Sequence, residues 1–405
     1  MADAEPLRLN EQLEESADGR FSRFELISWW DQERLANAKI VVIGAGALGN
    51  EIVKNLALLG VGQVFLADLD TVENSNLSRS VLFREADCGR AKVDVAAERG
   101  KDIYPEMRVR PFRGNVVYEL GLGIYRWADV IIGGLDNREA RVAINSAAAR
   151  TGKVWIDGAI ERLDGVARVF DPACGPCYEC TMSETDWKML EARRSCALLT
   201  REQMAAGKVP TTPTTGSIIA GMQVQEAVKF LHGMDTISGQ GFVFDGTYHQ
   251  SYLVTYTQKD DCPAHDPHEP IEAWDRSVSE LTVGQLLDRV CKDLDSPEAV
   301  IELNHDLLAG LQCVHCNEVE PRFTSLARVR ESDGICPNCG EPRVPQTYHS
   351  IGRSLGNADT LAEKTLAEIG VPSWDIVGGR VGLKRQYYEL IGDRPAVLGE
   401  LHDGN

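Results

Sequence analysis

Val41-Val-Ile-Gly44-Ala-Gly46-Ala-Leu-Gly49-Asn50 is the stretch that decides the fold of this 405-residue chain. It ends an apolar run at residues 39–43, which predicts a buried strand, and it leads into residues 50–59, whose pattern predicts a helix. Glycines at such a strand-to-helix turn let backbone N–H groups approach a phosphate at the positive end of the helix. The stretch therefore predicts a Rossmann-like, doubly wound α/β domain that binds a nucleotide.

The residues after this turn favour ATP over a nicotinamide or flavin cofactor. The next predicted strand, residues 63–67, ends at Asp68, at the distance where a carboxylate accepts the ribose hydroxyls. Arg79, Lys92 and Asp136 then follow along the chain. A triphosphate needs cations on its oxygens and a carboxylate on its magnesium ion, whereas hydride transfer has little use for either. An NAD-dependent oxidoreductase remains the alternative from another enzyme class.

Composition indicates a globular chain of two or three domains. The 61 acidic residues outnumber the 42 basic ones, and the formal charge of -19 argues against nucleic acid or an anionic membrane as the main partner. The first residues lack the basic and apolar segments of a secretory signal, and no apolar run is long enough to span a bilayer. We therefore expect a cytoplasmic protein that binds neither nucleic acid nor membrane.

Several separated motifs, in this order, resemble the adenylating superfamily that contains the ubiquitin-activating enzymes and the sulfur-carrier adenylyltransferases of molybdopterin and thiamine synthesis. The resemblance covers roughly the first two-thirds of the chain, and chance rarely produces so many motifs in order. It implies that the phosphate loop is formed by Gly44, Gly46 and Gly49, and that the ribose is held by Asp68. It also implies that the phosphates are bound by Asn76, Arg79 and Lys92 and the magnesium ion by Asp136.

The same resemblance implies a homodimer. Arg20-Phe-Ser-Arg23-Phe resembles the family's arginine finger, in which Arg23 reaches the phosphates of the neighbouring subunit's nucleotide. Ser80 departs from the family pattern, where glutamine is usual, so a contact near the phosphates is missing or replaced. Taken singly, Arg20, Arg23 and Arg79 could also be ordinary surface charges.

Four cysteines have the spacing of a zinc ribbon. Cys313-x2-Cys316 and Cys336-x2-Cys339 are separated by nineteen residues, and two such knuckles form a closed four-thiolate site. Closed sites are structural, so this one predicts stability or docking and not catalysis.

The resemblance implies a second zinc site. Cys177 and Cys180 have a close analogue in the activating family, where one CxxC pairs with another downstream. Here the downstream ligands would be Cys262 and His265, which gives three thiolates and an imidazole. Histidine in place of cysteine, and the nearby Cys174, leave the fourth ligand open.

Cys196 is the candidate nucleophile. It precedes Pro210-Thr-Thr-Pro-Thr-Thr-Gly216, which resembles the family's threonine-rich helix start, and the catalytic cysteine of ubiquitin-type activating enzymes lies before that start. Arg193 and Arg194 would favour the thiolate that attacks an acyl-adenylate. The alternative is an ordinary packing role, which we also expect for Cys88 and Cys291.

From about residue 277 the pattern changes to a small α+β module. Its expected elements are helices at residues 280–294 and 357–370 and strands at residues 299–303, 374–377 and 384–390. The expected division is an adenylation domain at 1–259 with a catalytic-cysteine segment at about 181–215, a linker at 260–276, and the module at 277–405 with its ribbon at 311–342.

The expected function is ATP-dependent activation of a small ubiquitin-like protein. A compact prokaryotic enzyme of this type would adenylate the carrier's C-terminus, form a thioester on Cys196, and hand it to a conjugating-like enzyme. The module lies where eukaryotic activating enzymes recruit that partner, although it could equally serve oligomerisation or stability. The alternatives are a sulfur-carrier adenylyltransferase and a nucleotide-sensing interaction protein without turnover.

Overall fold

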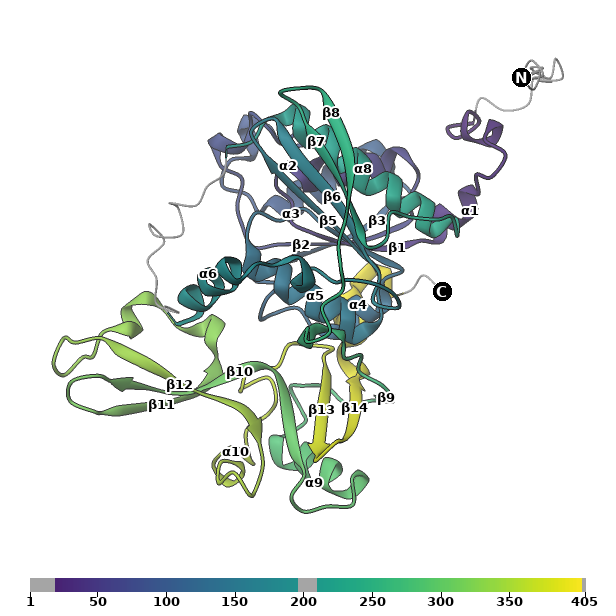
Figure 1. Ribbon diagram of the computed structural model, residues 1–405. Helices are drawn as coiled ribbons and strands as arrows, with labels where there is room; N and C mark the ends of the chain where they lie inside the picture. Colours follow the sequence, from purple (N-terminus) through teal and green to yellow (C-terminus); the bar gives the residue numbers. More distant parts are fainter. Residues whose placement is uncertain (1–18, 196–209, 403–405) are drawn as a thin grey trace, which may run out of the picture.

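The computed structural model describes residues 19–195 and 210–402, which are organised around two β-sheets (Figure 1). The larger sheet has the strand order β3-β2-β1-β4-β5-β6-β7-β8. Its strands are β1 (Lys39–Ile43), β2 (Gln63–Asp68), β3 (Arg108–Arg113), β4 (Val130–Gly133), β5 (Trp155–Glu161), β6 (Asp164–Phe170), β7 (Gln240–Asp245) and β8 (Gln250–Thr255).

The order of the parallel strands places the expected nucleotide site. Strands β3, β2, β1, β4 and β5 are parallel, and β6 to β8 continue the sheet antiparallel. The chain runs outward from β1 to β3 and then returns to β4 on the other side of β1. Ligands bind at the carboxyl ends of strands where the order reverses in this way, and here the reversal lies between β1 and β4.

Helices cover both faces of this sheet, which explains why β1 is apolar on both sides. Ile40 and Val42 face a cluster made with helices α1, α2, α3 and α8, whereas Val41 and Ile43 face α4, α5 and α6. The helices are α1 (Gln32–Asn37), α2 (Ala47–Leu58), α3 (Lys92–Ile103), α4 (Leu122–Trp127), α5 (Arg138–Thr151), α6 (Glu184–Ser195) and α8 (Pro213–Leu231). The predicted α/β fold class is confirmed.

The smaller sheet has the order β11-β10-β13-β14-β9, and β12 pairs with the other edge of β10. The long strand β10 therefore belongs both to the sheet and to the cysteine-rich hairpin. The elements are β9 (Ile271–Trp274), α9 (Val283–Asp293), β10 (Val300–Cys313), β11 (Val319–Ser325), β12 (Arg343–Ile351), α10 (Ala358–Leu361), β13 (Ile376–Val381), β14 (Lys384–Leu390) and α11 (Arg394–Leu398).

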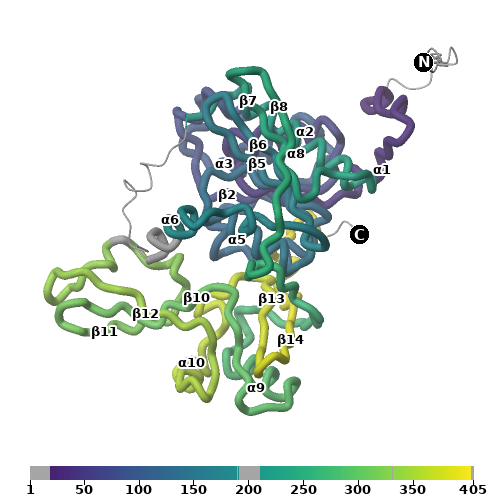
Figure 2. Tube along the Cα trace, in the orientation of Figure 1, coloured from purple at the N-terminus to yellow at the C-terminus, as the bar shows by residue number. Residues whose placement is uncertain are grey.

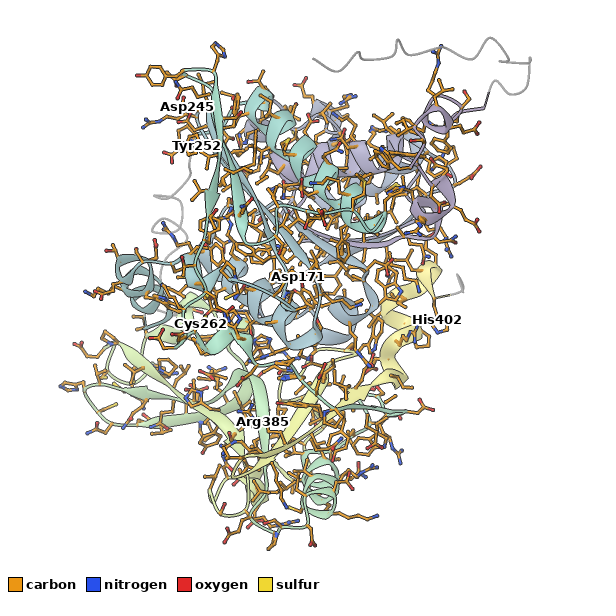
Figure 3. The ribbon with its side chains drawn as sticks, turned by 45° about the vertical axis from the view of Figure 1, so that its right-hand side comes forward. Asp171, Asp245, Tyr252, Cys262, Arg385 and His402 are labelled. Carbon is orange, nitrogen blue, oxygen red and sulfur yellow. The ribbon has the colours of Figure 1, made fainter. Side chains whose placement is uncertain are left out.

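The two parts share an apolar core. Trp374, Leu398 and Leu401 belong to the same buried cluster as Val41 and Ile43 of β1. Figure 2 shows the C-terminal segment, in yellow, returning to the larger sheet, and Figure 3 shows His402 beside that part of the molecule. The C-terminal module therefore closes one face of the nucleotide-binding fold.

Polar contacts fix the same boundary. Asp375 is buried and accepts a hydrogen bond from the Leu122 backbone N–H at 2.9 Å, and Arg126 pairs with Glu389. Lys101 pairs with Glu400 at 2.7 Å. Buried charges at a boundary need such partners, so the two parts are held in one arrangement.

Several expected elements need correction. Residues 260–276, expected as a linker, contain β9, which pairs in parallel with β14. The helix expected at 357–370 is only α10, because the chain turns after residue 361 and packs Leu366 and Ile369 into the core. Gly378 and Gly379, expected between two strands, lie inside β13 beside Tyr387 and Val290, which leave no room for a Cβ. The division at residues 259 and 276 stays a prediction.

Candidate nucleotide-binding site and metal centres

Each of the three glycines of the turn is required for a different structural reason. Gly44 has φ +96°, and a Cβ there would lie 2.5 Å from the Gly134 carbonyl oxygen. A Cβ on Gly49 would lie 1.9 Å from the Gly44 carbonyl oxygen. Gly46 faces open space, with nothing within 4 Å. Gly44 and Gly49 therefore permit close packing of the turn, and Gly46 leaves its outer side open to a ligand.

Gly46 is also the N-cap of α2, and no side chain caps that end. The first N–H groups of a twelve-residue helix thus lie beside the open face, where they favour an anion. Asn50 fixes the turn, because its Nδ2 donates to the Ala45 and Gly46 carbonyls and its Oδ1 accepts from the Leu82 N–H at 2.9 Å.

Asp68 ends β2 beside this turn. One carboxylate oxygen accepts the Ala45 N–H at 2.7 Å and the other accepts the Asp70 N–H at 2.8 Å. Burial raises the pKa of Asp68, and the positive charge of Lys92 opposes that shift. Each oxygen keeps a further lone pair, which is what acceptance of ribose hydroxyls requires.

The predicted phosphate ligands occupy the next segment. Lys92 begins α3, and its Nζ pairs with Asp70 Oδ2 at 2.8 Å. Asn76 is buried and its Oδ1 caps the Glu73 N–H at 2.9 Å. Arg79 is half-buried and donates to the Ser75 carbonyl at 2.6 Å. The structure therefore assigns Asn76 a turn-stabilising contact, and it buries Lys92 while leaving Arg79 half-buried.

Asp136 and Ser80 complete this region. Asp136 is exposed in the short connection from β4 to α5, and the Gly134 N–H in that connection donates to the Ile43 carbonyl at 2.8 Å. The connection therefore lies against the glycine turn. Ser80 is buried, and its hydroxyl has no hydrogen-bond partner among the described residues.

The structure does not bring the two N-terminal arginines to this site within one chain. Arg20 donates to the carbonyl of Ile103, the last residue of α3, and lies 5.2 Å from the Tyr104 ring centre. Lys92 is the first residue of α3, and a twelve-residue helix is about 18 Å long. Arg23 is exposed three residues from Arg20, so both lie at the opposite end of α3 from Lys92.

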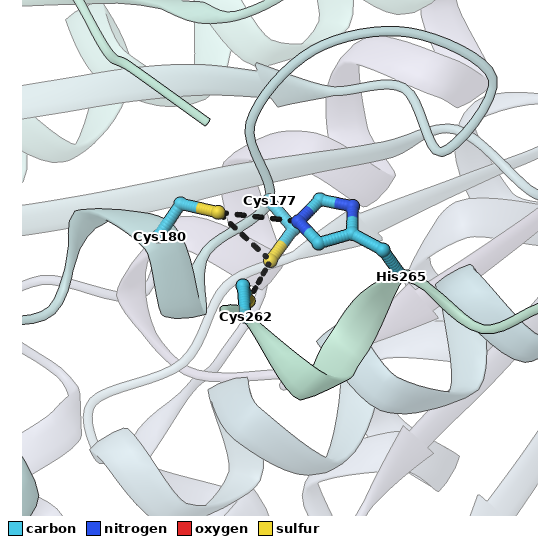
Figure 4. Close-up of side chains that lie close together, drawn as sticks. All are labelled: Cys177, Cys180, Cys262 and His265. Carbon is cyan, nitrogen blue, oxygen red and sulfur yellow. Dashed lines mark hydrogen bonds between the residues drawn. The ribbon is translucent and has the colours of Figure 1, made fainter. Parts of the chain in front are cut away.

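The first metal cluster joins Cys177, Cys180, Cys262 and His265 (Figure 4). Cys177 Sγ lies 3.8 Å from Cys180 Sγ and 3.6 Å from Cys262 Sγ. Tetrahedral zinc with Zn–S bonds of about 2.3 Å separates its sulfurs by about 3.8 Å, so this set could hold zinc.

His265 supplies the fourth ligand position, since its Nε2 lies 3.2 Å from Cys180 Sγ. Cys174 is exposed and directed to Asp171 instead. Burial alone would raise the pKa of Cys180, but the Lys259 N–H and His265 lower it to about 7. A thiolate is the form that binds metal.

The second cluster joins Cys313, Cys316, Cys336 and Cys339. Its sulfurs lie 3.4 Å apart for Cys313 and Cys339 and 3.7 Å apart for Cys316 and Cys336. Backbone N–H groups, that of Asn338 above all, lower the pKa of Cys336 to about 6. The predicted ribbon residues are thus assembled in a geometry that could hold zinc.

The predictions for the other cysteines have mixed outcomes. Cys196 lies outside the described residues, and α6 ends just before it at Ser195. Cys88 is exposed at the end of a short 3-10 turn, so it has no buried packing role. Cys291 is partly exposed on α9, where its sulfur accepts a hydrogen bond from Arg353 at 3.4 Å.

Sequence reasoning missed a buried charge cluster beside the β4–α5 connection. Asp157 is fully buried and pairs with Arg141 at 3.0 Å and with Arg168. The signal that could have found it is the pairing of Asp157, inside β5, with Arg168 across the β5–β6 hairpin. The role of Asn50 was missed too, because its position in the sequence does not indicate that its side chain links the glycine turn to Leu82.

The comparison with protein families decides the relationship of this chain. The model described as the ThiF family matches residues 19–264. The chain belongs to the ThiF family. The family match ends just after the Cys262 turn, so the smaller sheet lies almost wholly beyond it.

Relatives of this ThiF-family chain carry adenylyltransferase and activating-enzyme names. A sulfur carrier protein adenylyltransferase from Thermus thermophilus is 32% identical over 57% of this chain and 83% of its own length. A SAMP-activating enzyme E1 from Haloferax volcanii is 30% identical over 57% of this chain and 82% of its own.

A solved structure supports the fold. The crystal structure of Escherichia coli MccB with ATP has a TM-score of 0.52 at 22% identity, and the match covers 62% of this ThiF-family chain and 75% of that one. In the described part of the chain, no helix is both long enough and apolar enough to cross a membrane.

Proposed function

We propose that this ThiF-family chain adenylates the C-terminal carboxylate of a small ubiquitin-like protein and then takes the acyl group onto Cys196 as a thioester. The observation that carries the first step is the open side of Gly46 at the uncapped start of α2, with Lys92 and Arg79 on neighbouring segments. The names of the relatives support the adenylation step.

Both cations would exchange their present contacts for phosphate oxygens. Lys92 would leave the carboxylate of Asp70, and Arg79 would leave the carbonyl of Ser75. Charge-assisted bonds to phosphate are stronger than a bond to a neutral carbonyl. Asp68 would accept the ribose hydroxyls and so set the α-phosphate against the helix start.

The residues fit a magnesium ion on the phosphates. Asp136 is exposed, and its connection contacts the glycine turn through the hydrogen bond from Gly134 to Ile43, so an oxygen ligand is available where phosphates would lie. Magnesium, when bound, would neutralise phosphate charge. Asp136 is the residue of this chain that would hold it.

The proposed reaction has two steps, and in each step one bond forms as another breaks. A carboxylate oxygen of the carrier bonds to the α-phosphorus of ATP, and the bond to pyrophosphate breaks. Lys92 and Arg79 would stabilise the charge that develops on the departing phosphates. In the second step the thiolate of Cys196 bonds to the acyl carbon, and AMP leaves with the electron pair.

Arg23 would act on the site of a second copy. Its neighbour Arg20 is fixed at the far end of α3, so Arg23 does not reach Lys92 in its own chain. A homodimer in which each Arg23 contacts the partner's phosphates would complete both sites. The zinc ribbon and the smaller sheet would then serve docking of a conjugating-like enzyme or stability of the dimer.

The second candidate is sulfur-carrier adenylation without a thioester on this chain. The Thermus thermophilus relative, named for that activity, favours it. Both candidates share the acyl-adenylate and differ only in what happens to it. A nucleotide-sensing role without turnover would require loss of a phosphate ligand, and Arg79, Lys92 and Asp136 are all present.

Exchange of pyrophosphate with ATP tests the proposal. With magnesium and its cognate carrier, the chain should exchange labelled pyrophosphate into ATP, because acyl-adenylate formation is reversible. Asp136→Ala should abolish the exchange. Exchange that proceeds equally without a carrier, or that survives Asp136→Ala, would contradict the proposal.

A further inference from the structure

The β4–α5 connection, residues 134–137, carries Asp136, and it is short and exposed at that residue. An exposed carboxylate on a connection of this kind needs support if it is to point in one direction. Three hydrogen bonds supply it, two to the connection itself and one to Gly133, the last residue of β4. The first is from the Gly134 N–H to Ile43, at the end of β1.

The second hydrogen bond comes from Arg141, one turn into α5. Its Nη2 donates to the carbonyl of Leu135 at 2.6 Å and to that of Gly158 at 3.0 Å, and its Nε donates to Asp157 at 3.0 Å. Leu135 directly precedes Asp136. One guanidinium thus holds the connection against the interior of β5, at Asp157 and Gly158.

Asp157 fixes the direction of that guanidinium. It has 0% exposure, and its second oxygen accepts hydrogen bonds from Arg168. Because a buried carboxylate between two arginines is costly to disturb, Arg141 has little freedom to rotate. Burial alone would lower the pKa of Arg168, but Asp157 reverses that and raises it.

The third hydrogen bond comes from Gln223 of α8. Its Nε2 donates to the carbonyl of Gly133 at 2.7 Å, and the side chain is fully buried. Gly158 can pack there only because it has no Cβ, which would lie 2.3 Å from Gln223 Oε1. Arg141 and Gln223 therefore hold the backbone on the two sides of Gly134, at Leu135 and at Gly133.

We propose that Arg141 and Gln223 are positioning residues, which hold the β4–α5 connection so that Asp136 faces the phosphate-bound metal. This inference rests on the proposed function. Neither residue would need to touch the nucleotide. Arg141 acts on the carbonyl of Leu135, next to Asp136, Gln223 acts on that of Gly133 at the end of β4, and Asp157 acts on Arg141.

The test compares Arg141→Lys with Arg168→Lys. In both variants a positively charged side chain still faces the carboxylate of Asp157. Lysine at position 141 cannot also donate to Leu135 and Gly158, because it lacks the guanidinium fork. Arg168 makes no hydrogen bond to the β4–α5 connection among the described residues, so Arg168→Lys is the matched control.

ATP binding is measured by calorimetry with magnesium and again with EDTA, and the affinity ratio reports the metal-dependent gain. Arg141→Lys should reduce that ratio at least tenfold while leaving the affinity in EDTA within about twofold of the wild type. Arg168→Lys should lower thermal stability and leave the ratio unchanged. Gln223→Met, which leaves the charge cluster intact, should reduce the ratio as well.

The outcomes separate the two proposals. A wild-type chain that binds ATP no better with magnesium would overturn the metal role of Asp136 and this inference with it. A wild-type gain that Arg141→Lys and Gln223→Met both retain would overturn this inference alone. Equal loss of the ratio in Arg141→Lys and Arg168→Lys would also overturn it, because general loosening of the charge cluster would then be the cause.

Discussion

At the scale of single residues, two glycines of the nucleotide turn should have different effects on folding and on ATP binding when they are replaced. Gly46 has φ -77° and ψ -149°, a pair that lies outside the regions alanine favours, but its Cβ would enter open space. We expect Gly46→Ala to unfold at a slightly lower temperature than the wild type and to bind ATP at least tenfold more weakly, because the methyl group occupies the side that a phosphate approaches. Calorimetric titration and thermal unfolding measure both quantities.

Gly49→Ala is the matched comparison. Its Cβ would collide with the backbone oxygen of Gly44, so the helix start must shift, at a cost of about 3 kcal/mol in the free energy of unfolding. If Gly46→Ala binds ATP like the wild type, no phosphate approaches that residue.

Cys196 carries the prediction that separates the two carboxylate-activating functions. Incubation with ATP and carrier should give a covalent adduct that survives denaturation and disappears with a thiol reductant. Cys196→Ala should remove the adduct and keep pyrophosphate exchange, since adenylation precedes thiolate attack. Cys88→Ser and Cys291→Ser are the controls. Exchange without any adduct in the wild type would favour sulfur-carrier activation.

Two histidines at the boundary between the sheets should make stability depend on pH. Burial and the charge of Arg150 lower the pKa of His268 and of His305 to about 4, from an ordinary 6.5. The unfolded chain therefore binds more protons between these values, so stability is complete above pH 6.5 and falls as the pH drops towards 4.

The expected loss at pH 4 is about 3 kcal/mol for each histidine. Denaturant unfolding at pH 7.5 and pH 5 of the wild type and of His305→Gln measures it. The variant should lose less stability than the wild type over this interval. Parallel pH dependence in the two proteins would contradict the assignment.

At the scale of elements, the metal clusters belong to different structures and should have different consequences. We expect two zinc ions per chain. Cys313→Ser should lose one zinc and keep pyrophosphate exchange, because that cluster joins only β10, the turn between β10 and β11, and the loop before β12. Cys177→Ser should lose the other and lower the thermal stability of the nucleotide-binding fold.

Cys174→Ser is the control, since Cys174 lies outside the first cluster. Metal analysis that finds a single zinc in the wild type would remove one of the two sites. A Cys177→Ser protein with wild-type stability would show that the first cluster does not hold the chain after β8.

The sequence predicted best those elements whose pattern is set by burial alone. Strand β1 has the predicted bounds, Lys39–Ile43, because an interior parallel strand is apolar on both faces. The helix expected at residues 357–370 failed because tertiary contacts of Leu366 and Ile369 take over from local propensity.

The site was predictable to the same extent. Spacing identified the cluster of Cys313, Cys316, Cys336 and Cys339, since knuckle geometry is local. The family resemblance implied the other cluster, which joins Cys177 to the distant Cys262. The contacts of Arg141 join α5 to Leu135 in the β4–α5 connection and to Asp157 and Gly158 in β5, and no local pattern records which segments the fold will bring together.

At the scale of the whole molecule, the position of Arg23 predicts complementation between defective subunits. Arg23→Ala and Asp136→Ala should each depress pyrophosphate exchange. Mixing the two proteins should restore part of it, since a mixed dimer has one complete site. The mixture needs time to exchange subunits, and each variant mixed with itself is the control.

Full exchange activity in Arg23→Ala alone would disprove the arginine finger. No recovery in a mixture that demonstrably contains mixed dimers would place Arg23 and Asp136 in the same site of one chain.

The shared apolar core also bears on how the chain is made. Val41 and Ile43 belong to a cluster that includes Leu398 and Leu401, so this core is complete only about 360 residues after the first strand leaves the ribosome. At translation rates of roughly 5 to 20 residues per second, that interval is about 20 to 70 s. During it, the part of this core that Trp374, Leu398 and Leu401 complete is open to water and to other chains. Biogenesis of this protein should therefore depend on chaperones that shield the larger sheet until residues 374–401 have been made, and a chain cut short before Leu398 should be degraded faster than the wild type.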